Sequence, residues 1–284
     1  MATLIYELLC AHDGAEIRVA RFEPAGSAVG VIQVIHGFGE GLVHYRNVAD
    51  FFAREGYVCV IHDQRGFGEM PNKTEPQKKA ARGVIPGYTY LLEDVSTVRD
   101  KIGDWYPGLP VSLFGHSMGG NIAINFLLKY EQGRYESAII EAPWLRLYKP
   151  FPKFLTALGG LLGRMNKNWK VSAKLDMSDE RGQSLKADGI FHDYMSFRLY
   201  AEVTRAGEYA LEHAAGIRIP TLLLGAGADT IVSPAAIRLF AERAGGNVRF
   251  VEYPLGSHCL HGDEVNATAL EDMLGFLKGV GVGA

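Results

Sequence analysis

Short runs of apolar, β-prone residues recur along the chain, and each run ends at a turn or a polar residue. We predict strands at residues 29–35, 57–61, 111–114, 137–140, 221–224 and 248–253. Segments with a helical pattern lie between them, for example at residues 48–56 and 90–106. Near-continuous apolar strands that alternate with helices are typical of a mostly parallel sheet covered by helices on both faces. The pattern therefore predicts an α/β fold.

The alternation is interrupted once, between Pro143 and about residue 215. Connections in compact α/β domains are usually about 2 to 6 residues outside their helices. We therefore predict a core made of residues 1–142 and 216–284, with residues 143–215 inserted as a helical cap. One face of a predicted cap helix carries the apolar residues Phe151, Phe154, Leu155, Leu158, Leu161, Leu162 and Met165.

Two interpretations of this apolar face stay open. The commoner one is that it packs on the sheet, and the other is that it lines an acyl-binding pocket or touches a lipid surface. The region also carries basic residues and no acidic one between positions 149 and 174. An amphipathic basic segment favours contact with an anionic membrane surface. The basic residues are Lys149, Lys153, Arg164, Lys167, Lys170 and Lys174.

Composition limits the class of protein. A chain of 284 residues can bury about three quarters of its surface, which is enough for one large domain with an insertion. The net charge of −3 gives no indication of nucleic-acid binding. The widely spaced Cys10, Cys59 and Cys259 form no disulfide framework, and the sequence shows no signal peptide or membrane span. We expect a soluble, cytoplasmic protein.

The segment VSLFGHSMGGNIAINF, at residues 111–126, contains the motif that carries chemistry. Gly115, Ser117 and Gly119 fit the GxSxG pattern, and the pattern lies between a predicted strand and a predicted helix. In such a turn the serine hydroxyl is presented at the carboxyl edge of the sheet. The amide of Met118 points toward the same space, so we expect it to stabilise an oxyanion.

A serine nucleophile needs a base within hydrogen-bond reach and a carboxylate that orients the base. Asp229 follows the strand at 221–224, and His258 follows the strand at 248–253. We assign these two residues to the acid and the base, although Asp229 could instead be a turn residue or cap the helix that starts near Pro234. His261 is the rival base, and we predict that it starts a helix or supports the site.

The loop HGFGE at residues 36–40 is expected to supply a second amide for the oxyanion. Phe38, with a glycine on each side, is the natural candidate. His36 lies directly at a strand end, and we interpret it as a structural residue that positions the loop. Glu40 either forms a hydrogen bond within the loop or touches a polar group of the substrate, and the sequence does not separate these two roles.

Several motifs together resemble the monoacylglycerol lipase and lysophospholipase branch of the α/β-hydrolase family. They are HGFGE (36–40), HDQRGFG (62–68), YPGLPVSLFGHSMGG (106–120), the aspartate of GAGAD and the histidine of GSHCLHGDE. The resemblance implies an eight-stranded core, a triad of Ser117, Asp229 and His258, an oxyanion hole formed by Phe38 and Met118, no cofactor, and a helical cap over an acyl-binding pocket.

The chain departs from this family at two places. Gly41 stands where the family often has histidine, and RGFG stands where it often has RGHG. Neither position is in the triad. These departures leave the substrate more open than the reaction.

Other site types fit the sequence less well. A dinucleotide fingerprint in GFGEG would need glycine where the chain has Leu42. A haloalkane dehalogenase would need aspartate in place of Ser117. A metal site built from His258, Cys259, His261 and Asp263 lacks a second ligand cluster, so we expect no metal.

The sequence therefore predicts a serine hydrolase of carboxylic esters. Monoacylglycerols or similar single-chain lipid esters are the expected substrates, with no nucleic-acid partner and with membrane contact through the cap as an open option. A short-chain or aryl (hydroxycinnamoyl-type) carboxylesterase and an amidase or small-peptide hydrolase are alternatives. A ligand-binding receptor or scaffold on a hydrolase fold is the alternative from another class.

Overall fold

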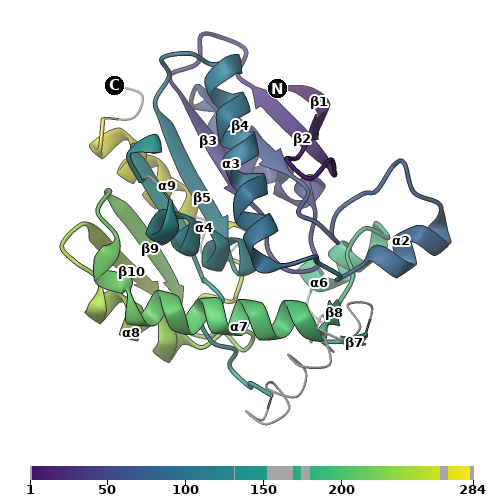
Figure 1. Ribbon diagram of the computed structural model, residues 1–284. Helices are drawn as coiled ribbons and strands as arrows, with labels where there is room; N and C mark the ends of the chain where they lie inside the picture. Colours follow the sequence, from purple (N-terminus) through teal and green to yellow (C-terminus); the bar gives the residue numbers. More distant parts are fainter. Residues whose placement is uncertain (1, 131, 152–168, 174–179, 263–267, 282–284) are drawn as a thin grey trace.

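The computed structural model describes the chain except for residues 1, 131, 152–168, 174–179, 263–267 and 282–284. Its centre is an eight-stranded sheet with the order β1-β2-β4-β3-β5-β6-β9-β10 (Figure 1). All six predicted strands are present, and they pair in parallel, so the predicted α/β fold is confirmed. The strands are β1 (Thr3–Cys10), β2 (Glu16–Glu23), β3 (Gly30–Ile35), β4 (Tyr57–His62), β5 (Val111–His116), β6 (Ser137–Glu141), β9 (Thr221–Ala226) and β10 (Val248–Tyr253).

The strands β1 and β2 form an antiparallel hairpin at one edge of the sheet, which the sequence pattern did not reveal. Strand β1 is exposed or half-buried except at Leu9, and β2 mixes buried positions with half-buried or exposed ones, whereas the central strands are buried along their whole length. Arg21 on β2 pairs with Glu7 on β1 at 2.6 Å. A search for continuous apolar runs does not find strands of this kind.

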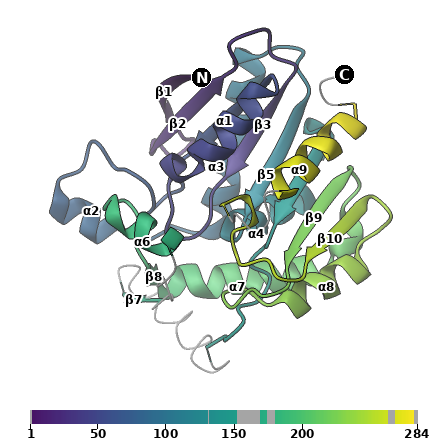
Figure 2. The same cartoon turned by 180° about the vertical axis from the view of Figure 1, so that it is seen from behind.

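Helices cover both faces of the sheet. On one face lie α3 (Tyr88–Trp105), α4 (Met118–Lys129) and α8 (Pro234–Arg243), and on the other lie α1 (Arg46–Arg54) and α9 (Thr268–Gly279) (Figures 1 and 2). Side chains of β3 alternate between the two layers: Val31 and Ile35 face the first, and Ile32 and Val34 face the second. The sheet is therefore buried on both sides, as its apolar sequence requires.

The predicted insertion contains β7 (Lys170–Ser172), α6 (Glu180–Ala187), β8 (Tyr194–Ser196) and α7 (Phe197–Glu212). Helix α7 packs along α4 of the core, and α6 lies beside α2 (Glu75–Ala81) in both views (Figures 1 and 2). The cap helix predicted from the apolar face at 151–165 falls almost wholly outside the described residues. The division of the chain into core and cap stays a prediction.

Short 3₁₀ helices complete the connections. They are η1 (Leu42–Tyr45), η2 (Gln132–Arg134), η3 (Ala214–Gly216) and η4 (Leu260–Gly262). Within the described residues, no helix combines the length and the apolar character that crossing a membrane requires.

Helix α4 approaches the end of β3 so closely that there is no room for a side chain at Gly119. A Cβ atom there would lie 2.0 Å from the carbonyl oxygen of Ile35. We expect Gly119→Ala to lower the free energy of unfolding by about 1–3 kcal/mol or more, because the backbones must separate. Urea denaturation measures this change.

Gly275, in α9, is the matched control because a Cβ atom at this position would meet nothing within 4 Å. Gly275→Ala is expected to raise the free energy of unfolding by about 0.5–1 kcal/mol, since alanine is the better helix former. Equal effects of the two substitutions would contradict the packing described for α4.

Candidate active site

Ser117 occupies the turn between β5 and α4 in a backbone conformation that residues other than glycine rarely adopt. Its φ is 54° and its ψ is −117°. The turn is held by main-chain hydrogen bonds, because the Ser117 amide donates to the Glu141 carbonyl at 3.0 Å and the Trp144 amide donates to the Ser117 carbonyl at 2.9 Å. Strain of this kind persists only where the surroundings impose it. The surroundings here hold the side chain at the carboxyl end of β5.

The predicted acid and base lie in line with the serine. His258 Nε2 is 2.9 Å from Ser117 Oγ, and His258 Nδ1 is 2.6 Å from Asp229 Oδ2. A carboxylate can only accept, so Nδ1 carries the ring proton and Nε2 presents its lone pair to the hydroxyl. This is the tautomer that a general base needs.

Asp229 is fixed by a second set of contacts. Its Oδ1 accepts hydrogen bonds from the amides of Ile231 at 2.7 Å and Val232 at 2.9 Å, and the residue is 2% exposed. Helix α8 is instead capped by Ser233, whose hydroxyl accepts from the Ala236 amide. The carboxylate therefore faces His258 and does not cap the helix.

The loop after β3 lies against Ser117. A Cβ atom on Gly37 would be 3.3 Å from the Cβ of Ser117, which shows how closely the loop approaches. Within the described part of the chain, the amide nitrogens of Phe38 and Met118 have no hydrogen-bond partner. Two unengaged amides beside a serine hydroxyl are what an oxyanion hole requires.

His36 and Glu40 fix the shape of this loop. The main-chain amide of Gln64 donates to His36 Nε2 at 2.9 Å. His36 Nδ1 therefore carries the ring proton and donates to the Gly37 carbonyl at 2.8 Å. Burial disfavours the charged ring and lowers the pKa of His36 to about 4. Glu40 Oε2 accepts from the Gly37 amide at 2.9 Å and from the Tyr45 hydroxyl at 2.7 Å. His36 is structural, as the sequence predicted, and the loop role of Glu40 is the one the structure supports.

Residues of the predicted insertion contact the same loop. The His192 amide donates to the Gly39 carbonyl at 3.1 Å, and His44 Nε2 lies 2.6 Å from Asp188 Oδ2. The His192 ring also stacks on Phe67, with ring centroids 5.1 Å apart. The segment from Asp188 to His192 therefore contacts both the loop after β3 and η1.

Sequence reasoning missed Glu141, a buried carboxylate that lies behind Ser117 and His258. His261 is the second residue of η4, and its Nδ1 lies 2.9 Å from the carboxylate of Glu141 at the end of β6. Both side chains are fully buried. A glutamate directly after the buried run SAII was the one signal that could have revealed it.

Residues 26–265 match the Hydrolase_4 family, described as serine aminopeptidase, S33. The chain belongs to this family. It is 25% identical over 257 residues to a monoacylglycerol lipase of Mycolicibacterium smegmatis, and the match covers 87% of this chain and 88% of the relative. The structure is also similar to a soluble variant of monoglyceride lipase from Saccharomyces cerevisiae, with a TM-score of 0.81, 22% identity and coverage of 98% and 96% of the two chains.

Another relative is much longer. An uncharacterized abhydrolase domain-containing protein of Dictyostelium discoideum is 24% identical over 245 residues, which are 84% of this chain and 25% of that protein. The predicted resemblance to the monoacylglycerol lipase branch of the α/β-hydrolases is confirmed, and so is the prediction of a serine ester hydrolase.

Buried histidines give the protein a defined response to acid. Burial lowers the pKa of His36 to about 4, that of His62 to about 3 and that of His192 to about 4. The unfolded chain binds protons at these rings below about pH 6.5, whereas the folded chain does not. Stability is therefore complete above about pH 6.5 and is lost as the pH falls toward 4, by up to about 1.4 kcal/mol per histidine and pH unit.

Urea denaturation at pH 7.5 and pH 5.0 measures this loss. Asp63 opposes it in part, because burial raises the pKa of this carboxyl to about 6 and the folded state then binds a proton first. His62→Gln should make the loss smaller, because it removes a buried ring that is protonated in the unfolded chain first. A free energy of unfolding that does not change between the two pH values would refute the account.

Proposed function

We propose that the protein hydrolyses monoacylglycerols or similar single-chain esters through an acyl-enzyme on Ser117. The observation that carries the proposal is the alignment of Ser117 Oγ, the His258 ring and the Asp229 carboxylate at 2.9 and 2.6 Å. Three groups of this kind, at these distances, can generate a serine alkoxide at neutral pH.

In the first half of the reaction, His258 Nε2 removes the proton of Ser117, and the Oγ atom attacks the ester carbonyl carbon. Asp229 holds the ring in place and stabilises the positive charge that the ring gains. The amides of Phe38 and Met118 donate to the carbonyl oxygen as it becomes negative. Each such donor typically contributes about 10²- to 10³-fold to the rate.

In the second half, the imidazolium of His258 gives its proton to the leaving alkoxide, and the carbon–oxygen bond to glycerol breaks. A water molecule then enters, His258 accepts one of its protons, and the hydroxide attacks the acyl carbon. Collapse of this intermediate releases the fatty acid and restores the proton on Ser117.

The substrate class rests on the monoacylglycerol lipase relatives and on the character of the predicted cap. Exposed aromatic side chains gather on both flanks of residues 152–168, at Tyr148, Phe151 and Trp169. Exposed apolar groups next to a basic segment suit an anionic lipid surface. We include peripheral contact of the cap with micelles or membranes in the proposal.

We place the reaction in the cytoplasm. Cys10, Cys59 and Cys259 form no disulfide with one another, as a reducing compartment favours. Burial raises the pKa of Cys59, which keeps this thiol protonated and unreactive.

Amide hydrolysis is the second candidate function, because the matching family is described as serine aminopeptidase. The same acyl-enzyme chemistry serves both bonds, but an amide needs its leaving nitrogen protonated by His258. Parallel assays on a lauroyl ester and the corresponding amide separate the two functions.

Initial rates on monoacylglycerols of increasing acyl length test the proposal. We expect kcat/KM to be highest for medium or long chains, since the acyl chain contributes buried apolar area. The Ser117→Ala protein should lose on the order of 10⁶-fold in kcat, as removal of a triad serine can. Its thermal unfolding should remain cooperative.

Turnover of short or aryl esters alone would show a small pocket and a general esterase. Equal inactivity of wild type and Ser117→Ala on every ester and amide would leave a ligand-binding role on a hydrolase fold. Either result would contradict the proposed lipid substrate. The second would also contradict a catalytic role for Ser117, Asp229 and His258.

A further inference from the structure

Glu141 ends strand β6, next to the strand that carries the nucleophile. The side chain is fully buried, and its main-chain carbonyl accepts the hydrogen bond from the Ser117 amide at 3.0 Å. A buried carboxylate is costly unless it is paired and hydrogen-bonded. The hydrogen-bond partners of the Glu141 carboxylate therefore indicate which part of the structure it fixes.

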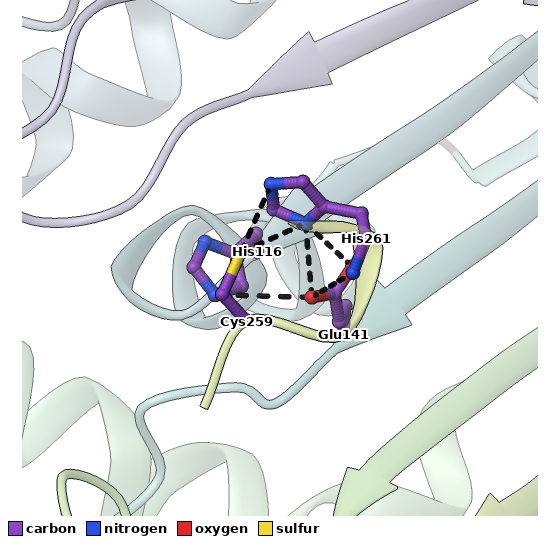
Figure 3. Close-up of side chains that lie close together, drawn as sticks. All are labelled: His116, Glu141, Cys259 and His261. Carbon is purple, nitrogen blue, oxygen red and sulfur yellow. Dashed lines mark hydrogen bonds and ion pairs between the residues drawn. The ribbon is translucent and has the colours of Figure 1, made fainter. Parts of the chain in front are cut away.

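Among the described residues, the hydrogen bonds of the Glu141 carboxylate come from the loop that follows His258, and Figure 3 shows the contact with the His261 ring. Oε1 accepts from the Leu260 amide at 2.8 Å and from the His261 amide at 3.3 Å. The His261 ring adds a contact from Nδ1 at 2.9 Å to each carboxylate oxygen. One side chain thus fixes two consecutive amides and a ring within three residues of the catalytic base.

The other side of His258 is held from the neighbouring strand. His116, at the end of β5, directs Nε2 toward the His258 carbonyl at 3.2 Å, and a carbonyl can only accept, so Nε2 carries a proton. The same nitrogen lies 3.9 Å from Glu141 Oε1. The ends of the adjacent strands β5 and β6 therefore hold this loop on both sides of Cys259, at the His258 carbonyl and at the Leu260 amide.

The charge on Glu141 is stabilised where it lies. Burial alone would raise the pKa of this carboxyl, but the charge and hydrogen bonds of His261 outweigh burial and lower the pKa to about 2. The carboxylate is consequently ionised across the neutral range and keeps its full strength as an acceptor. A charged acceptor forms hydrogen bonds about twice as strong as a neutral one.

The same cluster has the composition of a zinc site. Donor atoms of His116, Glu141, Cys259 and His261 lie within 4.8 Å of one another, and all four residues are buried (Figure 3). However, the carboxylate is already engaged by two amides and a ring, and Cys259 Sγ lies 3.2 Å from Nε2 and 3.6 Å from Nδ1 of His261. Because the sulfur contacts both ring nitrogens, it lies against the His261 ring. A single metal ion could be bound by only one of these two nitrogens. Hydrogen bonds from the Leu260 and His261 amides and the His261 ring account for the position of the Glu141 carboxylate.

We propose that Glu141 is a positioning residue for catalysis, which holds the His258 loop through its carboxylate and Ser117 through its carbonyl. The inference rests on the proposed roles of Ser117 and His258. It predicts that the distance between base and nucleophile depends on a carboxylate that touches neither of them. A misplacement of about 1 Å at such a site can reduce the rate by about 10²-fold.

Steady-state hydrolysis of p-nitrophenyl butyrate by wild type, Glu141→Gln and Glu141→Ala tests the proposal. Glutamine keeps an oxygen acceptor for the Leu260 amide but loses the charge, so we expect kcat to fall about 10-fold, and about 100-fold for alanine. KM should stay within about twofold in both variants, since the fully buried Glu141 side chain offers no surface to the substrate. A purely structural role would change the melting temperature and leave kcat of the folded enzyme unchanged.

Asp94→Asn is the matched control, because Asp94 is also a buried carboxylate in an ion pair, with Arg65 at 2.6 Å, but lies on α3. It should lower the melting temperature while kcat stays at the wild-type value. Unchanged kcat in Glu141→Gln would overturn the inference, and so would stoichiometric zinc in the purified protein with activity lost on chelation. Ser117→Ala in the same assay tests the proposed function separately. Activity that survives in Ser117→Ala would contradict the proposed role of Ser117 as the nucleophile, whereas an inactive Ser117→Ala with a fully active Glu141→Gln would contradict only the role of Glu141.

Discussion

The sharp turn from β5 into α4 is the constraint on which the site depends. Ser117 takes a φ of 54° there, and α4 can begin so close to the sheet only because Gly119 lets it approach the end of β3. The strain is offset by hydrogen bonds from neighbouring strand ends and by the buried layers on both faces of the sheet. The packed sheet therefore holds the strained turn in place, and the turn fixes the position of the Ser117 hydroxyl.

Buried polar contacts also fix the loops that carry Phe38 and His258. The loop of Phe38 is held by His36 and Glu40, and the loop of His258 by His116 and Glu141. In each case a side chain at or near a strand end binds the main chain of a loop. Loops are the variable part of such folds, so anchoring their amides preserves catalytic geometry while the outer surface changes.

The sequence indicated those parts of the site that follow directly from strand order. Ser117, Asp229 and His258 each come just after the carboxyl end of an apolar run, and parallel strands bring these ends to one edge. Glu141 was not found, because its role depends on how the loop after β10 folds back over β6. No spacing along the chain reports that contact.

Other differences have equally local causes. The β1–β2 hairpin was missed because β1 is largely exposed or half-buried at the edge of the sheet, and because both strands carry charged residues such as Arg21 and Glu7. Helix α7 lies inside the predicted insertion yet packs on α4, since a break in the strand pattern does not show which later helix returns to the core.

The central claim is that Ser117 is the nucleophile and that His258 activates it. Peptide mapping by mass spectrometry after labelling with an alkyl fluorophosphonate tests this most directly. The account predicts one phosphonyl group per chain, attached to Ser117, with labelling slowed by at least about 10³-fold in His258→Ala. An adduct on a different residue, or an unlabelled Ser117 in a protein that still hydrolyses esters, would contradict it.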